Sequence, residues 1–96
     1  MPKGYWIAHG IVHDAEAYEH YRQANGPVFA EYGAKFLVRA GAQIVAEGEA
    51  KPRTVVIEFP TIEAAHACYA SAEYQAAKEL RAGASDSDLV IVEGYD

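Results

Sequence analysis

The chain has 96 residues, enough for one domain and too few for a second, because independent domains cluster near about 100 to 150 residues. Its formal net charge is −6, with four Lys and four Arg scattered along the sequence. This balance argues against nucleic acid as a partner, since phosphates require clustered basic residues. Apolar residues make up 51% of the chain, more than one small core needs, so we expect a second copy of the chain to cover some of them.

The single cysteine, Cys68, cannot form an internal disulfide, and no charged and apolar leader with a small-residue cleavage site begins the chain. We therefore expect a cytoplasmic location. No apolar run approaches the roughly 20 residues that cross a bilayer, so no membrane segment is expected.

The first predicted element is a β-strand over Tyr5–Val12, which is rich in aromatic and β-branched residues and too short for a typical helix. Side chains alternate between two faces along a strand, and here both faces are largely apolar. We therefore predict that this strand is covered on both sides. One face carries Tyr5, Ile7, His9 and Ile11, and the other Trp6, Ala8, Gly10 and Val12.

A helix is predicted next, with Asp14 as its N-cap, because a carboxylate can accept hydrogen bonds from the free N–H groups of the first turn. Gly26 and Pro27 interrupt the pattern, so we expect a kink, or a break with Pro27 opening a second helical segment. Gly33 fits a left-handed C-cap. The residues that recur near the helical period are Tyr18, Tyr21, Val28, Phe29 and Tyr32.

The second strand is predicted over Lys35–Arg39 and resumes at Gln43–Glu47, after an irregularity at Ala40-Gly41 that is typical of a β-bulge. Gly48–Pro52 reads as a polar turn. The third strand covers Arg53–Phe59. Its faces carry Val55, Ile57 and Phe59 on one side and Thr54, Val56 and Glu58 on the other.

Two helical segments and a fourth strand complete the chain. Thr61 and Ser71 are N-cap residues for the two segments. Gly83–Asp88 is predicted to be a loop, and Leu89–Tyr95 the fourth strand. The inner positions are Ile62, Ala65, Cys68 or Tyr69, and Ala72 in the first segment, and Tyr74, Ala77 and Leu80 in the second.

The resulting order, β-α-β-β-α-β, is typical of a ferredoxin-like α+β domain, a four-stranded antiparallel sheet with its helices on one face. The helices leave the other face bare, although strands one, three and four are apolar on both faces. The simplest cover is the same face of a second subunit. We therefore predict a symmetric homodimer that associates through the helix-free face of the sheet.

Six segments, taken in order, resemble the domain of unknown function 1330 family and cover nearly the whole chain: Tyr5–His9, Tyr32–Arg39, Val56–Pro60, Ser71–Gln75, Leu80–Ala84 and Asp88–Gly94. The resemblance implies the dimeric α/β-barrel superfamily, in which two ferredoxin-like subunits join their sheets into a barrel. Relatives there include cofactor-independent monooxygenases, muconolactone isomerases and haem-degrading enzymes, while the family itself has no established reaction. The chain departs from the family at Ala34 and Ala40, where glycines are expected, and this bears on the bulge geometry beside Arg39.

His9, in the middle of an apolar strand, is the candidate catalytic residue. An imidazole has an ordinary pKa of about 6.5, so burial or a carboxylate neighbour would set it as a base near neutrality. The alternative is a core histidine that is hydrogen-bonded to the backbone or to a tyrosine hydroxyl.

The candidate substrate-binding residues are Arg39, Glu58 and a group of tyrosines. Arg39 can present a planar fork to a ligand carboxylate, or can pair with Glu58 and merely tie two strands together. The tyrosines either fill core space or line a pocket with an orienting hydroxyl, and Trp6 has the same two possible roles. These tyrosines are Tyr18, Tyr21, Tyr69 and Tyr74.

The remaining motifs point to no metal or cofactor. Ser71 lacks a Gly-x-Ser-x-Gly elbow, and the sequence has no phosphate loop or dinucleotide fingerprint. The histidines lack the usual ligand spacing; they are His9, His13, His20 and His66.

Two classes of function stay open. The first is an enzyme without an organic cofactor that binds a compact anionic or aromatic metabolite between sheet and helices. In it His9 would be the base, Arg39 the anchor and a tyrosine the orienting group. The second is a non-catalytic dimeric ligand-binding or interaction module. A pocket lined by His9, Arg39 and a tyrosine favours the first, and a solid core with Arg39 paired to Glu58 favours the second.

Overall fold

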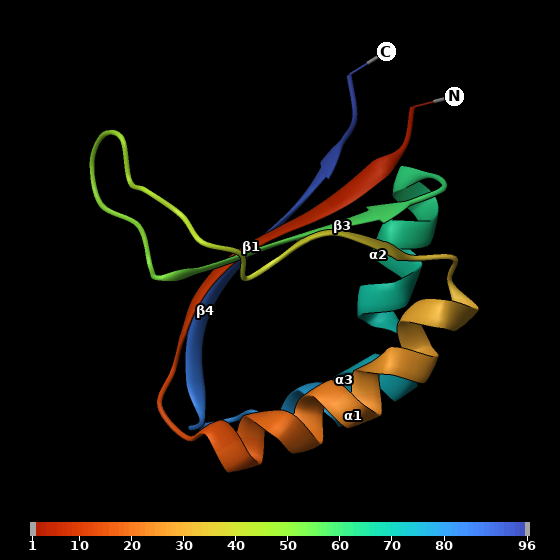
Figure 1. Cartoon of the computed structure of the whole chain (residues 1–96). Helices are drawn as coiled ribbons and strands as arrows, with labels where there is room; N and C mark the ends of the chain where they lie inside the picture. The colour runs from red at the N-terminus through yellow and green to blue at the C-terminus, as the bar shows by residue number, and fades with distance from the viewer. Residues whose placement is uncertain (1, 96) are drawn as a thin grey trace.

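An antiparallel sheet of four strands with three helices against one face makes up the part of the chain that the computed structural model describes, residues 2–95 (Figure 1). The strand order is β2-β3-β1-β4, and the predicted β-α-β-β-α-β sequence of elements is confirmed, with the second helical region divided in two. In chain order the elements are β1 (Gly4–Val12), α1 (Ala15–Glu31), β2 (Lys35–Arg39), β3 (Arg53–Phe59), α2 (Ile62–Ala70), α3 (Ala72–Glu79) and β4 (Ser85–Glu93).

Side-chain caps begin each helix where the sequence predicts them. The Asp14 carboxylate accepts a hydrogen bond from the Ala17 amide at 3.1 Å, and the Thr61 and Ser71 hydroxyls accept equivalent bonds in α2 and α3. Each bond satisfies a backbone N–H that has no partner within the helix. At the end of α1, Gly33 has φ 72°, in the left-handed region that allows a helix to stop there.

Of the two alternatives expected at Pro27, a kink or a break that opens a second helical segment, the break is wrong. Helix α1 is continuous from Ala15 to Glu31 with Pro27 inside it. Val28 and Phe29 come directly after the proline and are both buried in the core. Their packing holds the chain helical although the proline cannot donate a backbone hydrogen bond.

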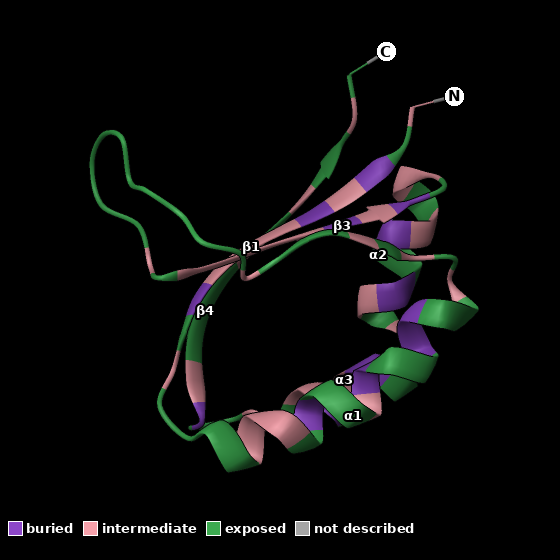
Figure 2. Ribbon diagram, in the orientation of Figure 1, coloured by how far each residue is buried: buried purple, intermediate pink, exposed green. Residues whose placement is uncertain are grey.

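The predicted continuation of the second strand at Gln43–Glu47 is also wrong. Residues 41–50 instead form an exposed arm that extends away from the helices (Figures 1 and 2). Strand β3 begins only at Arg53, so these residues have no neighbouring strand with which to pair. The last backbone hydrogen bond to β3 before this segment joins the Ala40 amide to the Thr54 carbonyl at 2.8 Å.

Strand β4 begins four residues earlier than predicted, at Ser85 instead of Leu89. The polar Ser-Asp-Ser-Asp run pairs with the second half of β1, with Ser85 opposite Val12 and Asp88 opposite His9. Composition favours a loop for this run, but the long β1 edge supplies it with a full set of hydrogen-bond partners. The strand ends at Glu93, so Gly94 and Tyr95 lie outside it.

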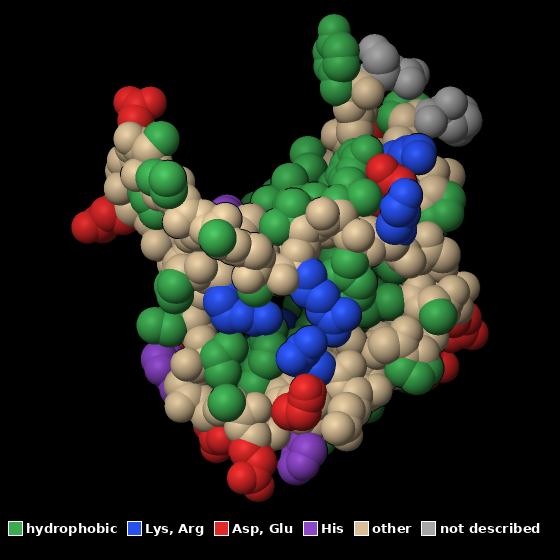
Figure 3. All heavy atoms as spheres, viewed as in Figure 1, with side chains coloured by type: hydrophobic (Ala, Val, Ile, Leu, Met, Phe, Trp, Pro, Cys, Tyr) green, Lys and Arg blue, Asp and Glu red, His purple; other side chains and the backbone are tan. Residues whose placement is uncertain are grey.

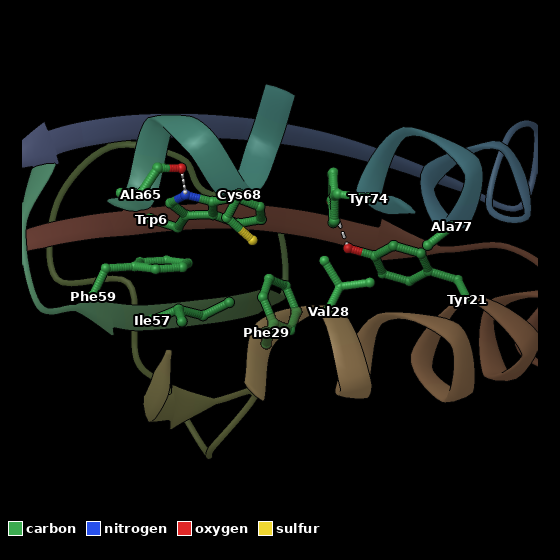
Figure 4. Packing of buried hydrophobic residues seen from close by; sticks show 10 residues of the cluster. All are labelled: Trp6, Tyr21, Val28, Phe29, Ile57, Phe59, Ala65, Cys68, Tyr74 and Ala77. Atoms are coloured by element: carbon green, nitrogen blue, oxygen red, sulfur yellow. Dashed lines mark hydrogen bonds between the residues drawn. The ribbon is translucent and has the colours of Figure 1, made fainter. Parts of the chain in front are cut away.

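Trp6 lies at the centre of the core between the sheet and the helices (Figure 4). Its indole Nε1 donates a hydrogen bond to the Ala65 carbonyl in α2 at 3.0 Å. The rings of Phe29, Phe59 and Tyr74 have centroids 5.0 to 5.3 Å from its own. The face of the sheet that carries Trp6 is called the inner face below, and the opposite face the outer face.

The inner positions of the short helices follow the prediction in part. Cys68 and Tyr74 are almost completely buried, and Ala65 and Ala77 pack beside them. Leu80, predicted on the inner side, is 46% exposed because α3 ends at Glu79 and the chain turns there.

Candidate functional site

A bulge in β2 directs Arg39 toward the inner face. Phe36 pairs with Ile57, but the register then shifts, so that Val38 pairs with Val56 and Arg39 with Val55. Phe36 and Arg39 therefore lie on the same face although they are three residues apart, which regular alternation does not allow. The bulge was predicted at Ala40-Gly41, whereas the register shift lies between Phe36 and Val38.

Ala40 follows Arg39 with φ 56°, the only non-glycine among residues 2–95 with a positive φ. An L-residue crowds its Cβ against the backbone in this region, whereas glycine enters it freely. The family resemblance led us to expect glycine at this position, and the backbone here has the conformation that glycine favours.

A pocket lies between the inner face and helices α1 and α3, with a water-accessible volume of about 70 Å³. Its inner walls are aromatic and apolar, with Trp6, Phe29, Phe36, Ile57 and Leu89 among the lining residues. All four arginines of the chain line it as well: Arg22, Arg39, Arg53 and Arg81.

Three of these arginines rest on aromatic rings. The guanidinium carbons of Arg39, Arg53 and Arg81 lie 4.4, 5.0 and 5.1 Å from the ring centroids of Phe36, Tyr18 and Tyr21, respectively. Such contacts cover one flat side of a guanidinium and leave N–H groups at its edge free to donate. The aromatic rings thus hold the arginines in place as hydrogen-bond donors.

The pocket carries a strong excess of positive charge. Within residues 2–95, no Asp, Glu, His or Lys lines it. Arg22 has a carboxylate neighbour, Glu19, at 3.5 Å, outside the pocket lining. Lys and Arg side chains border a hollow near the centre of the view in Figure 3. In a chain of net charge −6, this concentration of guanidinium groups gives the pocket a locally positive charge, the sign that attracts anions.

Polar groups also lie in the buried part of the pocket. The hydroxyls of Tyr21 and Tyr74 are 2.7 Å apart and form a buried hydrogen bond (Figure 4). Burial, together with the nearby Tyr21, raises the pKa of Tyr74 well above its ordinary value, so this phenol is a neutral hydroxyl at physiological pH. Asn25, on the same side of α1, also lines the pocket and is 5% exposed.

The pocket brings together some of the residues predicted as a site and leaves out others. Arg39, Tyr18 and Tyr74 line it, as do Tyr21 and Trp6. The residues outside it are His9, Glu58 and Tyr69.

His9 lies on the outer face, away from Arg39, so the predicted pocket of His9, Arg39 and a tyrosine does not form. Its Nδ1 is 3.1 Å from the Thr54 hydroxyl, which in turn contacts the Gln43 amide oxygen at 2.5 Å. His9 is three residues after Trp6 in β1, and residues an odd number of positions apart in a strand point to different faces. Because Trp6 packs toward the helices, His9 points away from them.

The side chains of Glu58 and Tyr69 form hydrogen bonds with lysines and do not line the pocket. The Glu58 carboxylate accepts bonds from Lys3 Nζ and the Tyr5 hydroxyl, each at 3.2 Å, and the bond from Lys3 lowers its pKa. The predicted alternative of an ion pair between Glu58 and Arg39 is wrong, because the two side chains lie on opposite faces of the sheet. The Tyr69 hydroxyl accepts a bond from Lys78 at 2.9 Å, which lowers its pKa.

Sequence reasoning missed Arg22, Arg53, Arg81 and Asn25, and treated the basic residues as scattered. Two signals could have found some of them. Arg53 continues the alternation that places Val55 and Ile57 on the inner face. Arg22 and Asn25 follow the helical spacing of the inner residues of α1. No local pattern marks Arg81, which lies in the turn after α3.

Residues 2–95 contain no group of three or more His, Cys, Asp or Glu side chains that could hold a metal ion. None of their helices combines the length and apolar character that a membrane crossing requires.

The fold and the pocket define a ferredoxin-like α+β protein with a cationic, aromatic-walled pocket between sheet and helices. The chain belongs to the domain of unknown function 1330 family, whose model matches residues 3–95. Among curated proteins, none matches this chain.

Several solved structures share the fold at low sequence identity. RPA0582 from Rhodopseudomonas palustris, a protein of unknown function, is 21% identical with a TM-score of 0.78, over 99% of this chain and 84% of its own. SnoaB from Streptomyces nogalater, a cofactor-independent oxygenase, is 14% identical with a TM-score of 0.66, over 100% and 96%. A dimeric ferredoxin-like protein of unknown function from Thermobifida fusca is 18% identical with a TM-score of 0.60, over 96% and 91%.

Proposed function

We propose that this protein binds a small organic acid in the arginine-lined pocket and acts on the bound anion without a cofactor. The observation that carries the proposal is the convergence of all four arginines on one pocket that no carboxylate of the described residues lines. Guanidinium groups match carboxylates in shape and charge, and the aromatic walls suit an apolar or aromatic body. The small volume favours a compact molecule.

The chemistry that this pocket suits is stabilisation of negative charge on a substrate oxygen. Fixed guanidinium groups in a partly dry site favour an enolate or phenolate over its neutral acid, and stabilise it most where charge develops during reaction. The neutral Tyr74 hydroxyl adds a hydrogen-bonding group in the buried part of the pocket. SnoaB, which shares the fold, is a cofactor-independent oxygenase, and this supports a reaction that needs no cofactor.

The second candidate function is ligand binding without catalysis. It is favoured by one observation: among the described residues, the pocket lining includes no His, Cys or carboxylate that could serve as a general base near neutral pH. Under this alternative the same arginines bind the acid but leave it unchanged. Turnover of a bound acid in the presence of air would separate the two functions.

We also propose that the protein is a homodimer that associates through the outer face. The centre of that face is an apolar strip made by Ile7, Val56, Val90 and Val92 on three adjacent strands. Val90 is 57% exposed in the single chain, and burial of such a strip favours association. The dimeric ferredoxin-like protein from Thermobifida fusca shares the fold and supports the proposal.

Binding of benzoate and of butyrate, measured by isothermal titration calorimetry, tests the pocket. We expect wild type to bind at least one of these acids, and Arg39→Gln to weaken binding about tenfold or more, because a charge-assisted hydrogen bond is lost. The matched control is Lys35→Gln, which removes one charge from the same strand at a position outside the pocket lining. Equal losses in the two variants, or no binding by wild type, would contradict the proposal.

A further inference from the structure

Asn25, which lines the pocket, has a buried hydrogen-bond acceptor without a partner in the described part of the chain. It lies one helical turn after Tyr21 and one before Phe29, on the side of α1 that faces the sheet. The residue is 5% exposed, and its Oδ1 has no hydrogen-bond partner among residues 2–95. Buried side-chain acceptors are nearly always paired, so this amide oxygen calls for a donor that the described chain does not provide.

Neither helix stability nor core packing explains an asparagine at this position. Asparagine is a weaker helix former than leucine or alanine, and burying its amide without a partner is unfavourable. The neighbouring inner residues of the helix, Tyr21, Val28 and Phe29, are aromatic or apolar. An apolar residue in place of Asn25 would fill the same space without leaving a polar atom unpaired.

We infer that Asn25 is a specificity residue that accepts a hydrogen bond from a hydroxyl group of the ligand, so that the protein selects a hydroxy acid. This inference rests on the proposed function, because the acid group is what the arginines bind. The four guanidinium groups repel an ammonium donor, whereas a neutral hydroxyl enters without that cost. A neutral donor such as a hydroxyl therefore suits Asn25 better than an ammonium group.

The burial of the lining residues indicates how such a ligand lies. Arg22 and Arg39 are exposed and Arg53 is partly exposed, whereas Asn25 and Tyr74 are buried. The carboxylate therefore faces the arginines near solvent and the hydroxyl points inward. Between them the walls are aromatic, with Trp6 among the lining residues, and this fits a flat hydroxylated ring.

Calorimetric titration with benzoate, 3-hydroxybenzoate, 4-hydroxybenzoate and 4-methoxybenzoate tests the inference. 4-Methoxybenzoate has an oxygen at the same ring position as 4-hydroxybenzoate but cannot donate a hydrogen bond. We expect wild type to bind the better hydroxybenzoate about five- to tenfold more tightly than benzoate or methoxybenzoate. Asn25→Leu should lose this preference and keep its affinity for benzoate. Ser87→Ala removes another polar group from the lining and should retain the preference.

The possible outcomes separate this inference from the proposed function. If benzoate binds and hydroxylation makes no difference in wild type, the role of Asn25 is refuted while the organic-acid pocket stands. If none of the four compounds binds but butyrate does, the role of Asn25 is refuted and the organic-acid pocket stands. If butyrate does not bind either, both are refuted. If Asn25→Leu does not fold, Asn25→Asp replaces it in the test. The carboxylate of this variant still accepts a hydrogen bond from a hydroxyl, so the preference for a hydroxybenzoate should persist. Its negative charge should weaken the binding of all four acids. Loss of the preference in Asn25→Asp would overturn the inference.

Discussion

The side chains of Arg53 and Tyr18 interact in two ways at the edge of the pocket. Arg53 Nη1 donates a hydrogen bond to the Tyr18 hydroxyl at 3.0 Å, and its guanidinium carbon lies 5.0 Å from the centroid of the same ring. The hydroxyl fixes the direction of the guanidinium and the ring supports its flat side. Arg53 is therefore held in position before a ligand arrives.

Tyr18→Phe should weaken binding of an organic acid about threefold to tenfold, because the ring remains while the hydrogen bond, worth about 1 kcal/mol, is lost. The measurement is calorimetric titration with the tightest-binding carboxylate. Tyr95→Phe removes an exposed hydroxyl outside the pocket and serves as the control, with no change expected. Unchanged affinity in Tyr18→Phe would show that the position of Arg53 does not depend on this bond.

Ala40→Gly should stabilise the folded protein by about 0.5 to 1 kcal/mol, because it relieves an L-residue at φ 56° next to Arg39. Urea unfolding followed by circular dichroism measures the change. Gly48→Ala is the reverse control: Gly48 has φ 75° with open space around its Cβ position, so this substitution should destabilise by about 1 kcal/mol through the backbone alone. If Ala40→Gly instead lowered the free energy of unfolding, the Ala40 side chain would stabilise the fold by more than its backbone strain costs.

The buried bond between Tyr21 and Tyr74 predicts a non-additive mutant cycle. Tyr74→Phe leaves the Tyr21 hydroxyl buried without its partner and should destabilise by about 1 to 3 kcal/mol. The double substitution Tyr21→Phe with Tyr74→Phe removes both polar groups and should cost clearly less than the two single effects together. Urea unfolding of all four proteins gives the coupling energy, and simple additivity would contradict the structure.

Local signals in the sequence predicted the local features of the fold. Asp14, Thr61 and Ser71 act as caps because a capping residue needs only the backbone of the next turn. The arm at residues 41–50 contains Ile44 and Val45, which favour a strand, but a strand also needs a neighbour, and that information is not local. The polar start of β4 at Ser85 is the converse case, in which an available edge overrides composition.

The candidate site was predictable only in part, for the same physical reason. Alternation alone placed His9 and Trp6 on different faces of the sheet. A pocket between sheet and helices therefore could not contain both His9 and the side chains around Trp6. Arg53 would have followed from extending the alternation of β3 by one residue pair. Arg39 was predicted as a binding residue from its side-chain type. Its place on the inner face was not predictable, because the register shift in β2 moves it there and no single residue in the sequence marks that shift.

Stability should fall with rising pH above about 9, in part through Cys68. Burial, with a smaller contribution from the charge of Glu31, raises the pKa of this thiol from 9.0 to about 12. Above pH 9 the unfolded thiol loses its proton while the folded one keeps it, so the free energy of unfolding decreases until about pH 12. Cys68→Ala should show a shallower decrease between pH 9 and 10.5 in urea unfolding. A decrease as steep as that of wild type would assign the effect to other groups.

Val90→Glu should dissociate the proposed homodimer, because it places a charge in the apolar strip of the outer face, next to Ile7. Light scattering during size-exclusion chromatography at micromolar concentration should give twice the chain mass for wild type and the single-chain mass for the variant. Ala67→Glu adds the same charge at an exposed position of α2 and should remain dimeric. A wild-type protein that elutes with the single-chain mass would show that solvent covers this strip, and the symmetric association through the helix-free face would then be wrong.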